Sequence, residues 1–181
     1  MTQPKSAYSF MQKEEKIERH TFAILVDNTP GVLARVIGMF SARGYNIESL
    51  TVSAVDKEKK ISRITIVTTG TPRTIQQIKS QLSRIVPVHS AIDLYDYEHI
   101  EKEVALIKVK AEDSERREVL RLAEIFKVQV VDTTLETFQF MIEGDAKKVS
   151  QFIDLLEKTS EVEVARSGVV AMSCGSDILS V

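Results

Sequence analysis

Residues 21–40, TFAILVDNTPGVLARVIGMF, decide the fold of this chain of 181 residues. The start of this stretch, residues 21–26, is β-prone and almost entirely apolar, which predicts a strand. Residues 27–31 then interrupt the run with residue types that are typical of turns. Beyond the turn, apolar side chains recur every three or four positions, which predicts an amphipathic helix that carries Leu33, Val36, Ile37 and Phe40.

The two ends of this helix have sequence signals of their own. Thr29 is expected to cap the N-terminus, and Pro30 suits the first helical position, where its missing N–H costs nothing. Gly44 is expected to end the helix, because glycine adopts the positive φ that helix C-termini often need. The strand, the turn and the helix should therefore form one compact connection.

The residues that follow complete a unit. Alternating apolar residues predict strands at residues 47–55, 61–69 and 86–94, with a polar hairpin loop between the first two. A second helix should begin at Thr71-Pro72, with an apolar stripe of Ile75, Ile78, Leu82 and Ile85. The order of elements in this unit is β-α-β-β-α-β.

The same order recurs in the second half of the chain. The expected strands lie at residues 104–109, 128–132, 138–143, 162–166 and 168–174. The expected helices are residues 115–126 and a segment capped by Asp145, with a stripe of Val149, Phe152, Ile153 and Leu156. This repeat predicts an α+β fold of two ferredoxin-like units, each an antiparallel sheet with both helices on one face.

The repeat divides the chain into four parts. We expect a mobile tail at residues 1–18, a first unit at 19–95, a short linker at 96–103 and a second unit at 104–181. Each antiparallel sheet leaves edge strands whose backbone groups are unpaired. Because pairing between two chains would satisfy those groups, a homodimer is expected.

Composition and charge exclude several classes of function. The chain has 24 basic and 26 acidic residues and a net charge of -2, so it lacks the broad basic field that attracts nucleic acid. Its single cysteine, Cys174, allows no internal disulfide and no paired-cysteine metal site. No apolar run approaches the roughly 20 residues that span a bilayer, so we expect no membrane partner and, by default, a cytoplasmic protein.

The turn at residues 27–33 is the most informative candidate for a binding site. It leads into a helix N-terminus, where free N–H groups and the helix dipole favour a small carboxylate. Gly31 would let a ligand approach the backbone, and the amide of Asn28 suits a zwitterion because it both donates and accepts. Val32 and Leu33 would line an aliphatic side chain. The alternative is an ordinary strand-to-helix turn, which uses the same residue types.

Residues 43–47, RGYNI, form a second candidate. A helix end followed by a strand start explains Gly44 fully but explains Tyr45 and Asn46 less well. If the following strand is the edge used for dimerisation, Asn46 would face the Asn28 turn of a second copy. Ligand binding and dimer packing would then be a single event.

The corresponding turn of the second unit differs in charge. Residues 110–115, KAEDSE, contain three acidic residues and neither glycine nor proline. Fixed negative charge would repel a carboxylate. The second unit is therefore not expected to bind the same ligand in the same way.

No catalytic or metal-binding constellation is recognisable. His20, His89 and His99 are scattered without the spacing of metal ligands, and we interpret them as surface residues. The motifs of phosphate loops, dinucleotide sites and serine hydrolases do not occur. The acidic residues between the units are interpreted as solvated; they are Asp96, Glu98, Glu101 and Glu103. The chain itself is expected to be no enzyme and to hold no cofactor or metal.

Residues 28–33, NTPGVL, and 40–52, FSARGYNIESLTV, closely resemble the small regulatory subunits of acetolactate synthase (acetohydroxyacid synthase). Residues 62–67, SRITIV, fit the same family. The first unit resembles an ACT domain and the second resembles that family's C-terminal domain. The likeness covers nearly all of the chain after the tail, and residues 40–52 are its most specific part.

The resemblance implies a regulatory role in branched-chain amino acid biosynthesis. The catalytic large subunit of this family makes acetolactate from pyruvate, and it is expected to hold thiamine diphosphate, Mg and FAD. The small subunit would raise that activity and confer feedback inhibition, usually by valine, bound between the ACT domains of a homodimer. The second unit would dock the catalytic subunit. The implied effector-binding residues are Asn28, Thr29, Pro30, Gly31, Val32 and Leu33 of one chain with Asn46 and Ile47 of the other.

Two other classes of function stay open. The chain could be a free-standing tandem sensor that acts on a different target protein, or an enzyme in its own right, against which the missing catalytic groups argue. The residues do not choose among valine, leucine and isoleucine, because one methylene is worth only ~1–3 kcal/mol in an apolar pocket.

Overall fold

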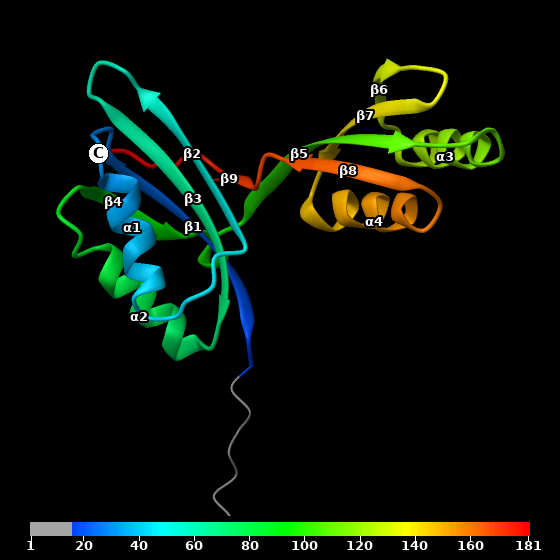
Figure 1. Cartoon of the computed structure of the whole chain (residues 1–181). Coiled ribbons are helices and arrows are strands. Elements are labelled where there is room, and N and C mark those ends of the chain that lie inside the picture. Colours follow the sequence, from blue (N-terminus) through cyan, green and yellow to red (C-terminus); the bar gives the residue numbers. More distant parts are fainter. Residues whose placement is uncertain (1–15) are drawn as a thin grey trace, which may run out of the picture.

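The computed structural model describes residues 16–181, which form two lobes connected by a long strand (Figure 1). The expected tail at residues 1–18 lies outside the described residues, apart from its last three. The elements of the first lobe are β1 (Glu18–Asp27), α1 (Val32–Ser41), β2 (Ser49–Asp56), β3 (Ile61–Gly70), α2 (Pro72–Leu82), β4 (Val88–Asp93) and a single 3₁₀ turn, η1 (Leu94–Asp96).

The first lobe is an antiparallel sheet in the order β2-β3-β1-β4, with α1 and α2 on one face (Figure 1). Side chains of β1 alternate between the two faces, as the period of a strand requires. Phe22 and Ile24 point to the helices and are fully buried, together with Val36 and Phe40 of α1. Each large apolar side chain buried in this way contributes about 1.5–3 kcal/mol, so packing on this face holds the helices in place.

The cap expected for the second helix is confirmed. The Thr71 hydroxyl accepts a hydrogen bond from the Thr74 N–H at 3.3 Å, and Pro72 is the first helical residue. The helix is shorter than its apolar stripe suggested: it ends at Leu82, and Ile85 packs against the core from the connection to β4.

The cap expected for α1 is wrong, whereas its C-terminal signal is confirmed. The helix begins at Val32, and the N-cap is Gly31, whose φ of 85° is left-handed. Thr29 and Pro30 instead form a turn before the helix, because the Val32 N–H donates to the Thr29 carbonyl at 3.4 Å. At the other end Gly44 has the positive φ that was expected, 67°.

The second lobe repeats the architecture of the first. Its elements are β5 (His99–Lys110), α3 (Asp113–Phe126), β6 (Gln129–Thr133), β7 (Thr137–Gly144), α4 (Ala146–Glu157), β8 (Glu161–Arg166) and β9 (Val170–Ser173). The main sheet has the order β6-β7-β5-β8, and α3 and α4 pack on one face of it (Figure 1). The α+β class with two ferredoxin-like units is therefore confirmed.

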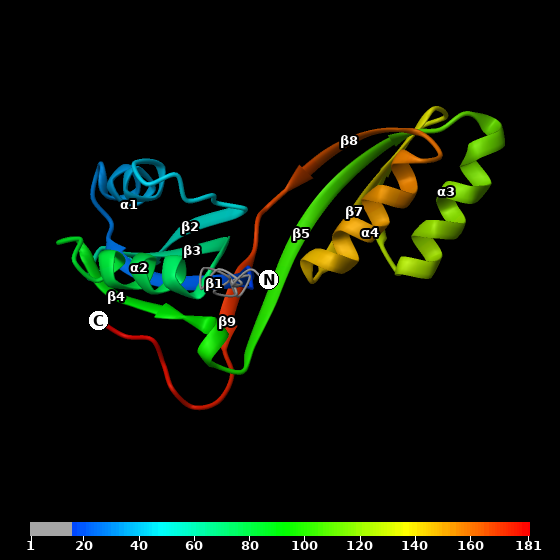
Figure 2. The same ribbon diagram turned by 90° about the horizontal axis from the view of Figure 1, so that it is seen from below.

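The linker expected at residues 96–103 is wrong, because β5 begins at His99 and continues without a break to Lys110. Seen from below, β5 runs from the first lobe into the second (Figure 2). Its first residues pair with β9, and its remaining residues pair with β7 and β8. Glu101, Lys102 and Glu103 therefore belong to a strand with alternating burial rather than to a solvated loop.

The chain returns to the first lobe after β8, while β9 still pairs with β5 of the second lobe. After β8 the chain kinks at Gly168, which has a φ of 79°, and β9 then crosses the helix-free face of the first sheet. A small core forms there from Ala23, Val67, Leu94, Val169 and Ala171. We call residues 167–173 the strap, because they tie the two lobes together.

The strap is fixed by polar contacts with β2 and β3. The Val169 N–H donates to the Ser49 hydroxyl at 2.7 Å, and the Thr51 hydroxyl donates to the Val169 carbonyl at 2.9 Å. Two residues further along the strap, the Ala171 carbonyl accepts a hydrogen bond from the Arg63 guanidinium at 2.7 Å. These contacts connect an edge strand of the first lobe directly to the strand that leaves the second.

Arg166→Met is expected to lower the free energy of unfolding by about 1–2 kcal/mol. Arg166 pairs with Glu103, whose side chain is only 3% exposed whereas that of Arg166 is 37% exposed. Removal of the cation would leave a buried carboxylate without its partner, and solvent access on the arginine side reduces the cost. Urea denaturation measures the change. The double variant with Glu103→Gln should recover most of the loss, and a double variant as unstable as Arg166→Met would contradict this explanation.

Candidate functional site

The turn that follows β1 is held by backbone contacts on both sides. The Asn28 N–H donates to the Lys60 carbonyl at 2.7 Å, which ties the turn to the tip of the β2–β3 hairpin. The Asp27 N–H donates to the Pro87 carbonyl at 3.0 Å, which ties it to the start of β4. The side chains between these anchors are exposed at Asn28, Thr29 and Pro30. The turn is thus a fixed loop with an open surface.

The N-terminus of α1 offers unoccupied hydrogen-bond donors. Gly31 has no side chain to cap the helix, and the first turn contains no acidic residue. The N–H groups of Leu33 and Ala34 make no hydrogen bond with any described residue. Free N–H groups and the positive end of the helix dipole together favour a small anion at this position.

Val32 and Leu33 form an apolar surface beside the free N–H groups of α1. Val32 is 5% exposed and belongs to the core beneath the turn, whereas Leu33 is half-buried at its edge. A carboxylate at the N–H groups would therefore have an apolar surface beside it. This combination suits an amino acid with an aliphatic side chain.

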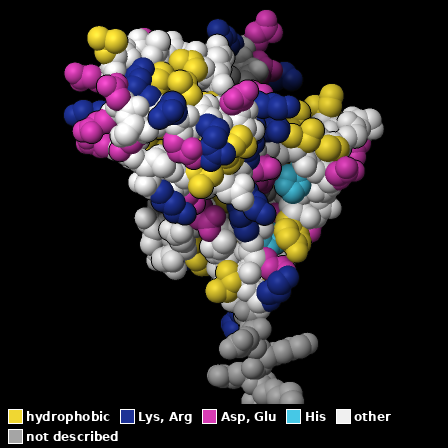
Figure 3. All heavy atoms as spheres, turned by 90° about the vertical axis from the view of Figure 1, so that its right-hand side faces the viewer, with side chains coloured by type: hydrophobic (Ala, Val, Ile, Leu, Met, Phe, Trp, Pro, Cys, Tyr) yellow, Lys and Arg dark blue, Asp and Glu magenta, His cyan; other side chains and the backbone are white. Residues whose placement is uncertain are grey.

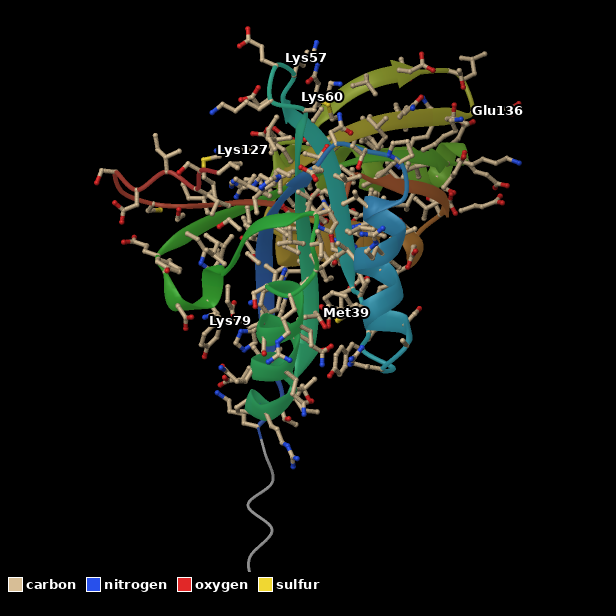
Figure 4. All side chains as sticks on the ribbon, turned by 90° about the vertical axis from the view of Figure 1, so that its left-hand side faces the viewer. Met39, Lys57, Lys60, Lys79, Lys127 and Glu136 are labelled. Atoms are coloured by element: carbon tan, nitrogen blue, oxygen red, sulfur yellow. The ribbon has the colours of Figure 1, made fainter. Side chains whose placement is uncertain are left out.

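Asn46 and Ile47 lie at the other end of α1. The helix has 10 residues, so at about 1.5 Å per residue it separates them from Asn28 by about 15 Å within one chain. In Figure 4, Lys57 and Lys60 mark the end of the domain that holds the turn, and Met39 marks the end that leads to Asn46. One chain does not bring the two predicted halves of the site together, and their meeting across a dimer stays a prediction.

The segment that contains Asn46 nevertheless fits an edge that faces outward. β2 is an edge strand of the first sheet, and the exposed Asn46 side chain precedes it. The Asn46 carbonyl is held by the Thr68 hydroxyl at 2.6 Å, so the backbone is fixed while the amide is free. Tyr45 has a structural role, because its ring packs edge-on against that of Phe40 with the ring centroids 6.2 Å apart.

In the second lobe, the N-terminus of α3 is capped by side chains of its own turn. Glu112 and Glu115 form a capping box, in which the Glu112 N–H donates to the Glu115 carboxylate at 3.2 Å. Asp113 adds a further acidic group to the first turn of α3. The capping box occupies the Glu115 N–H, the counterpart of the free Ala34 N–H in α1, and places two carboxylates at this helix N-terminus, which supports the prediction that the second unit does not bind the same ligand.

The interpretation of the histidines needs correction at one position. His20 is buried, its Nδ1 lies 2.8 Å from a carboxylate oxygen of Asp93, and its ring packs against Tyr95 with centroids 4.3 Å apart. His89 is exposed and pairs with Asp27 at 2.6 Å. Among residues 16–181 no group of three potential metal ligands comes together.

Of the four acidic residues interpreted as solvated, Asp96 and Glu98 are exposed, whereas Glu101 and Glu103 are not. Glu101 accepts a hydrogen bond from Arg19 at 2.8 Å and another from the Thr21 hydroxyl, and Glu103 is buried against Arg166. Their partners come from β1 and from the end of β8. The sequence contained no local signal for these contacts, because the partners are far away along the chain.

The surface carries charges of both signs. On the face shown in Figure 3, basic and acidic side chains are intermixed, with hydrophobic side chains between them. None of the helices in the described part of the chain has the length and apolarity needed to cross a membrane. Cys174, the single cysteine, is exposed.

Comparison with protein families assigns both lobes. Residues 22–90 match the family described as the AHAS small subunit-like ACT domain. Residues 102–175 match the family described as the small subunit of acetolactate synthase. The boundary between the two matches coincides with the end of the first sheet and the beginning of β5.

Individual proteins show the same relationship over most of the chain. The acetolactate synthase small subunit of Haemophilus influenzae is 42% identical over 158 residues, which cover 87% of this chain and 96% of that protein. The isozyme 3 small subunit of Escherichia coli is 41% identical and covers 89% of this chain and 99% of its own length. The crystal structure of the small subunit from Thermotoga maritima superposes with a TM-score of 0.76 at 36% identity, over 88% of this chain and 99% of that chain. The chain therefore belongs to the family of acetolactate synthase small subunits.

Proposed function

We propose that this chain is the regulatory subunit of an acetolactate synthase, which activates a separate catalytic subunit and makes it sensitive to valine. The observation that supports this proposal most directly is the asymmetry between the two helix N-termini. The N-terminus of α1 leaves two N–H groups free and has no acidic residue in its first helical turn, whereas that of α3 carries a capping box and two acidic residues in its first turn. One lobe is thus suited to bind an amino-acid carboxylate and the other is not.

In this proposal valine binds between two copies of the chain. Its carboxylate lies at the free N–H groups of α1, its ammonium group meets the Asn28 amide, and its side chain contacts Leu33. Asn46 and Ile47 of the second copy close the site from the edge of β2. Valine inhibits only if it binds one dimer arrangement more tightly than the activating arrangement.

We further propose that the second lobe docks the catalytic subunit. One face of its sheet is covered by α3 and α4, whereas Val104 and Leu106 on the opposite face are 39% and 41% exposed. Thiamine diphosphate, Mg and FAD would belong to that catalytic subunit. Apolar side chains in an uncovered sheet face are a suitable contact surface for another protein.

Reconstitution with the catalytic large subunit tests the proposed function. Addition of this chain should raise the rate of acetolactate formation several-fold and introduce inhibition by valine that the large subunit alone lacks. The two proteins should also copurify. An unchanged rate, together with no copurification in the presence or absence of valine, would favour the alternative, a free-standing sensor that acts on another target.

A further inference from the structure

A cavity of about 460 Å³ lies on the helix-free face of the first sheet, away from the proposed effector turn. Its floor is formed by Leu25 of β1 with Ile61 and Arg63 of β3, and Val55 of β2 stands at one side. The C-terminal segment that follows β9 closes the other side. Figure 4 shows this segment in red on the opposite side of the sheet from α1 in blue. The volume lies within the range of about 300–1,000 Å³ that is usual for small-molecule sites.

The walls of the cavity are mainly apolar. Leu25 and Ile61 are only 5% and 4% exposed, so the floor is shielded from water. Met172 of β9, Ile178 and Leu179 border the opposite side, where Met172 and Ile178 remain 64% and 86% exposed. Apolar walls with few polar groups are the usual composition of a site for a small organic molecule.

Arg63 places an unneutralised cation at the edge of this floor. None of the ion pairs among residues 16–181 includes its guanidinium, which donates to the Ala171 carbonyl and to no other described residue. Burial lowers the pKa of Arg63, although the guanidinium remains charged at neutral pH. Most of its N–H donors are therefore available for a carboxylate, which arginine binds through paired hydrogen bonds.

The remaining charged groups lie around the mouth of the cavity. Asp56 accepts a hydrogen bond from the Lys59 N–H at 2.9 Å and so stabilises its own hairpin, while Lys59 and Asp177 are exposed. Val181 also lines the wall of the cavity. Asp177 is therefore solvated, Asp56 is engaged in its own hairpin, and Arg63 is the charged group on the floor.

The C-terminal segment forms a cover that is held mainly by one side chain. The Cys174 N–H donates to the Glu98 carbonyl at 2.7 Å, and residues 175–181 make no hydrogen bond with any described residue. Leu179 alone of this segment packs against the small core beneath the strap. A segment with so few contacts can open locally at low cost and admit a ligand.

From the cavity, its apolar walls and the free guanidinium on its floor, we propose a second ligand site in this protein, which takes a small aliphatic monocarboxylate. The carboxylate pairs with Arg63, the hydrocarbon chain lies over Leu25 and Ile61, and the C-terminal segment closes over it. This site is separate from the effector turn and does not depend on the proposed function. It shares one structural link with that turn, because Asn28 is bonded to the same hairpin that carries Lys59.

Calorimetric titration of the full chain with butyrate, hexanoate and octanoate tests the site. Affinity should rise about fourfold for each added methylene, since each buries more apolar surface. Hexanamide, which has the same chain without the charge, should bind at least about tenfold more weakly than hexanoate. Equal affinity of the acid and the amide would overturn the role of Arg63.

Isotope labelling of the methionine methyl groups reports where the probe binds. Hexanoate should shift the Met172 signal, which comes from the cavity wall, and leave those of Met39 and Met141 unchanged. A shift at Met39 or Met141 without one at Met172 would overturn the location. Displacement of hexanoate by valine in direct competition would assign the probe to the effector turn and would also overturn it.

Variants distinguish the effect of the Arg63 charge on binding from its effect on the structure. Arg63→Gln should weaken hexanoate binding at least about tenfold, whereas Arg84→Gln, which removes an exposed arginine at the end of α2, should not change it. Because Arg63 also holds the strap, Val55→Asp gives a second test: it adds a carboxylate at a position that is 53% exposed and should weaken binding about fivefold or more. Unchanged affinity in both Arg63→Gln and Val55→Asp would overturn the site.

Removal of residues 174–181 tests the cover. The shortened chain keeps Arg63 and the floor but loses one apolar wall, so hexanoate should bind about tenfold more weakly. Tighter binding to the shortened chain would overturn the proposal in its present form, because it would show that the C-terminal segment itself competes for Arg63.

Discussion

Gly31→Asp should reduce valine affinity by about 100-fold or more, which is the largest effect we expect at the effector turn. The new carboxylate would stand at the N-cap of α1, where it repels the valine carboxylate and competes for the free N–H groups. An effect of about 3 kcal/mol corresponds to this loss. Calorimetry with valine measures it. Aspartate tolerates the left-handed conformation better than most residues, so the domain should remain folded.

Two further variants define the cause of that loss. Asn28→Ala should weaken valine binding about 10- to 100-fold, because hydrogen bonds to charged groups contribute about 1.5–3 kcal/mol. Ser114→Asp introduces the same charge into the first turn of α3 and should leave the affinity unchanged. Wild-type affinity in both Asn28→Ala and Gly31→Asp would remove the turn from the effector site.

Gly168→Val should lower the free energy of unfolding by about 2–4 kcal/mol. The residue has a φ of 79°, and a left-handed conformation costs a non-glycine residue about 1–2 kcal/mol. Its Cβ would also stand 2.9 Å from the Ser49 hydroxyl and 3.2 Å from the Leu50 carbonyl, so the strap would have to move away from β2. Overpacking of this kind costs about 1–3 kcal/mol more. Urea denaturation of the full chain gives the value.

Gly175→Val is the matched control. Gly175 has a φ of 93°, yet a Cβ there would meet nothing within 4 Å, so this variant contains the backbone strain without the collision. Its effect should therefore be smaller by about 1–3 kcal/mol. If the two variants lower the free energy of unfolding equally, the close contact between the strap and β2 does not contribute to the loss of stability in Gly168→Val.

The elements that could be predicted are those whose signals are local. Both rounds of β-α-β-β-α-β followed from apolar spacing, and the stripe of Val149, Phe152, Ile153 and Leu156 is the buried face of α4. The caps at Thr71 and Asp145 were also correct, because a side chain that bonds to a backbone N–H three residues later is a local feature. Repetition of the pattern in both halves made the fold class secure.

The features that were missed depend on partners far along the chain. Glu101 and Glu103 looked like residues of a solvated linker, and only folding places Arg19 and Arg166 beside them. The continuity of β5 has the same origin, since its first residues become a strand by pairing with β9. The sequence also contains no local sign that Gly168 must pass close to Ser49.

The candidate site was predictable in composition but not in geometry. The turn residues Asn28 and Gly31 were identified from their types, yet the helix was expected to begin two residues too early. This difference matters, because in a helix that began at Pro30 the Leu33 and Ala34 N–H groups would donate to the carbonyls of Thr29 and Pro30, whereas the structure leaves both groups free. The position of Asn46 at the far end of α1 likewise follows only from the folded lobe.

The return of β9 to the first lobe has a consequence for synthesis of the protein on the ribosome. The strands and helices of the first lobe leave the ribosome early, but Val169 and Ala171, which cover Ala23 and Val67, are made only after the helices and main sheet of the second lobe. Until residues 169–171 have been made, the nascent chain presents an apolar sheet face to the surrounding medium. Truncated products that stop within the second lobe should consequently aggregate or be captured by chaperones, since they lack the segment that completes the first.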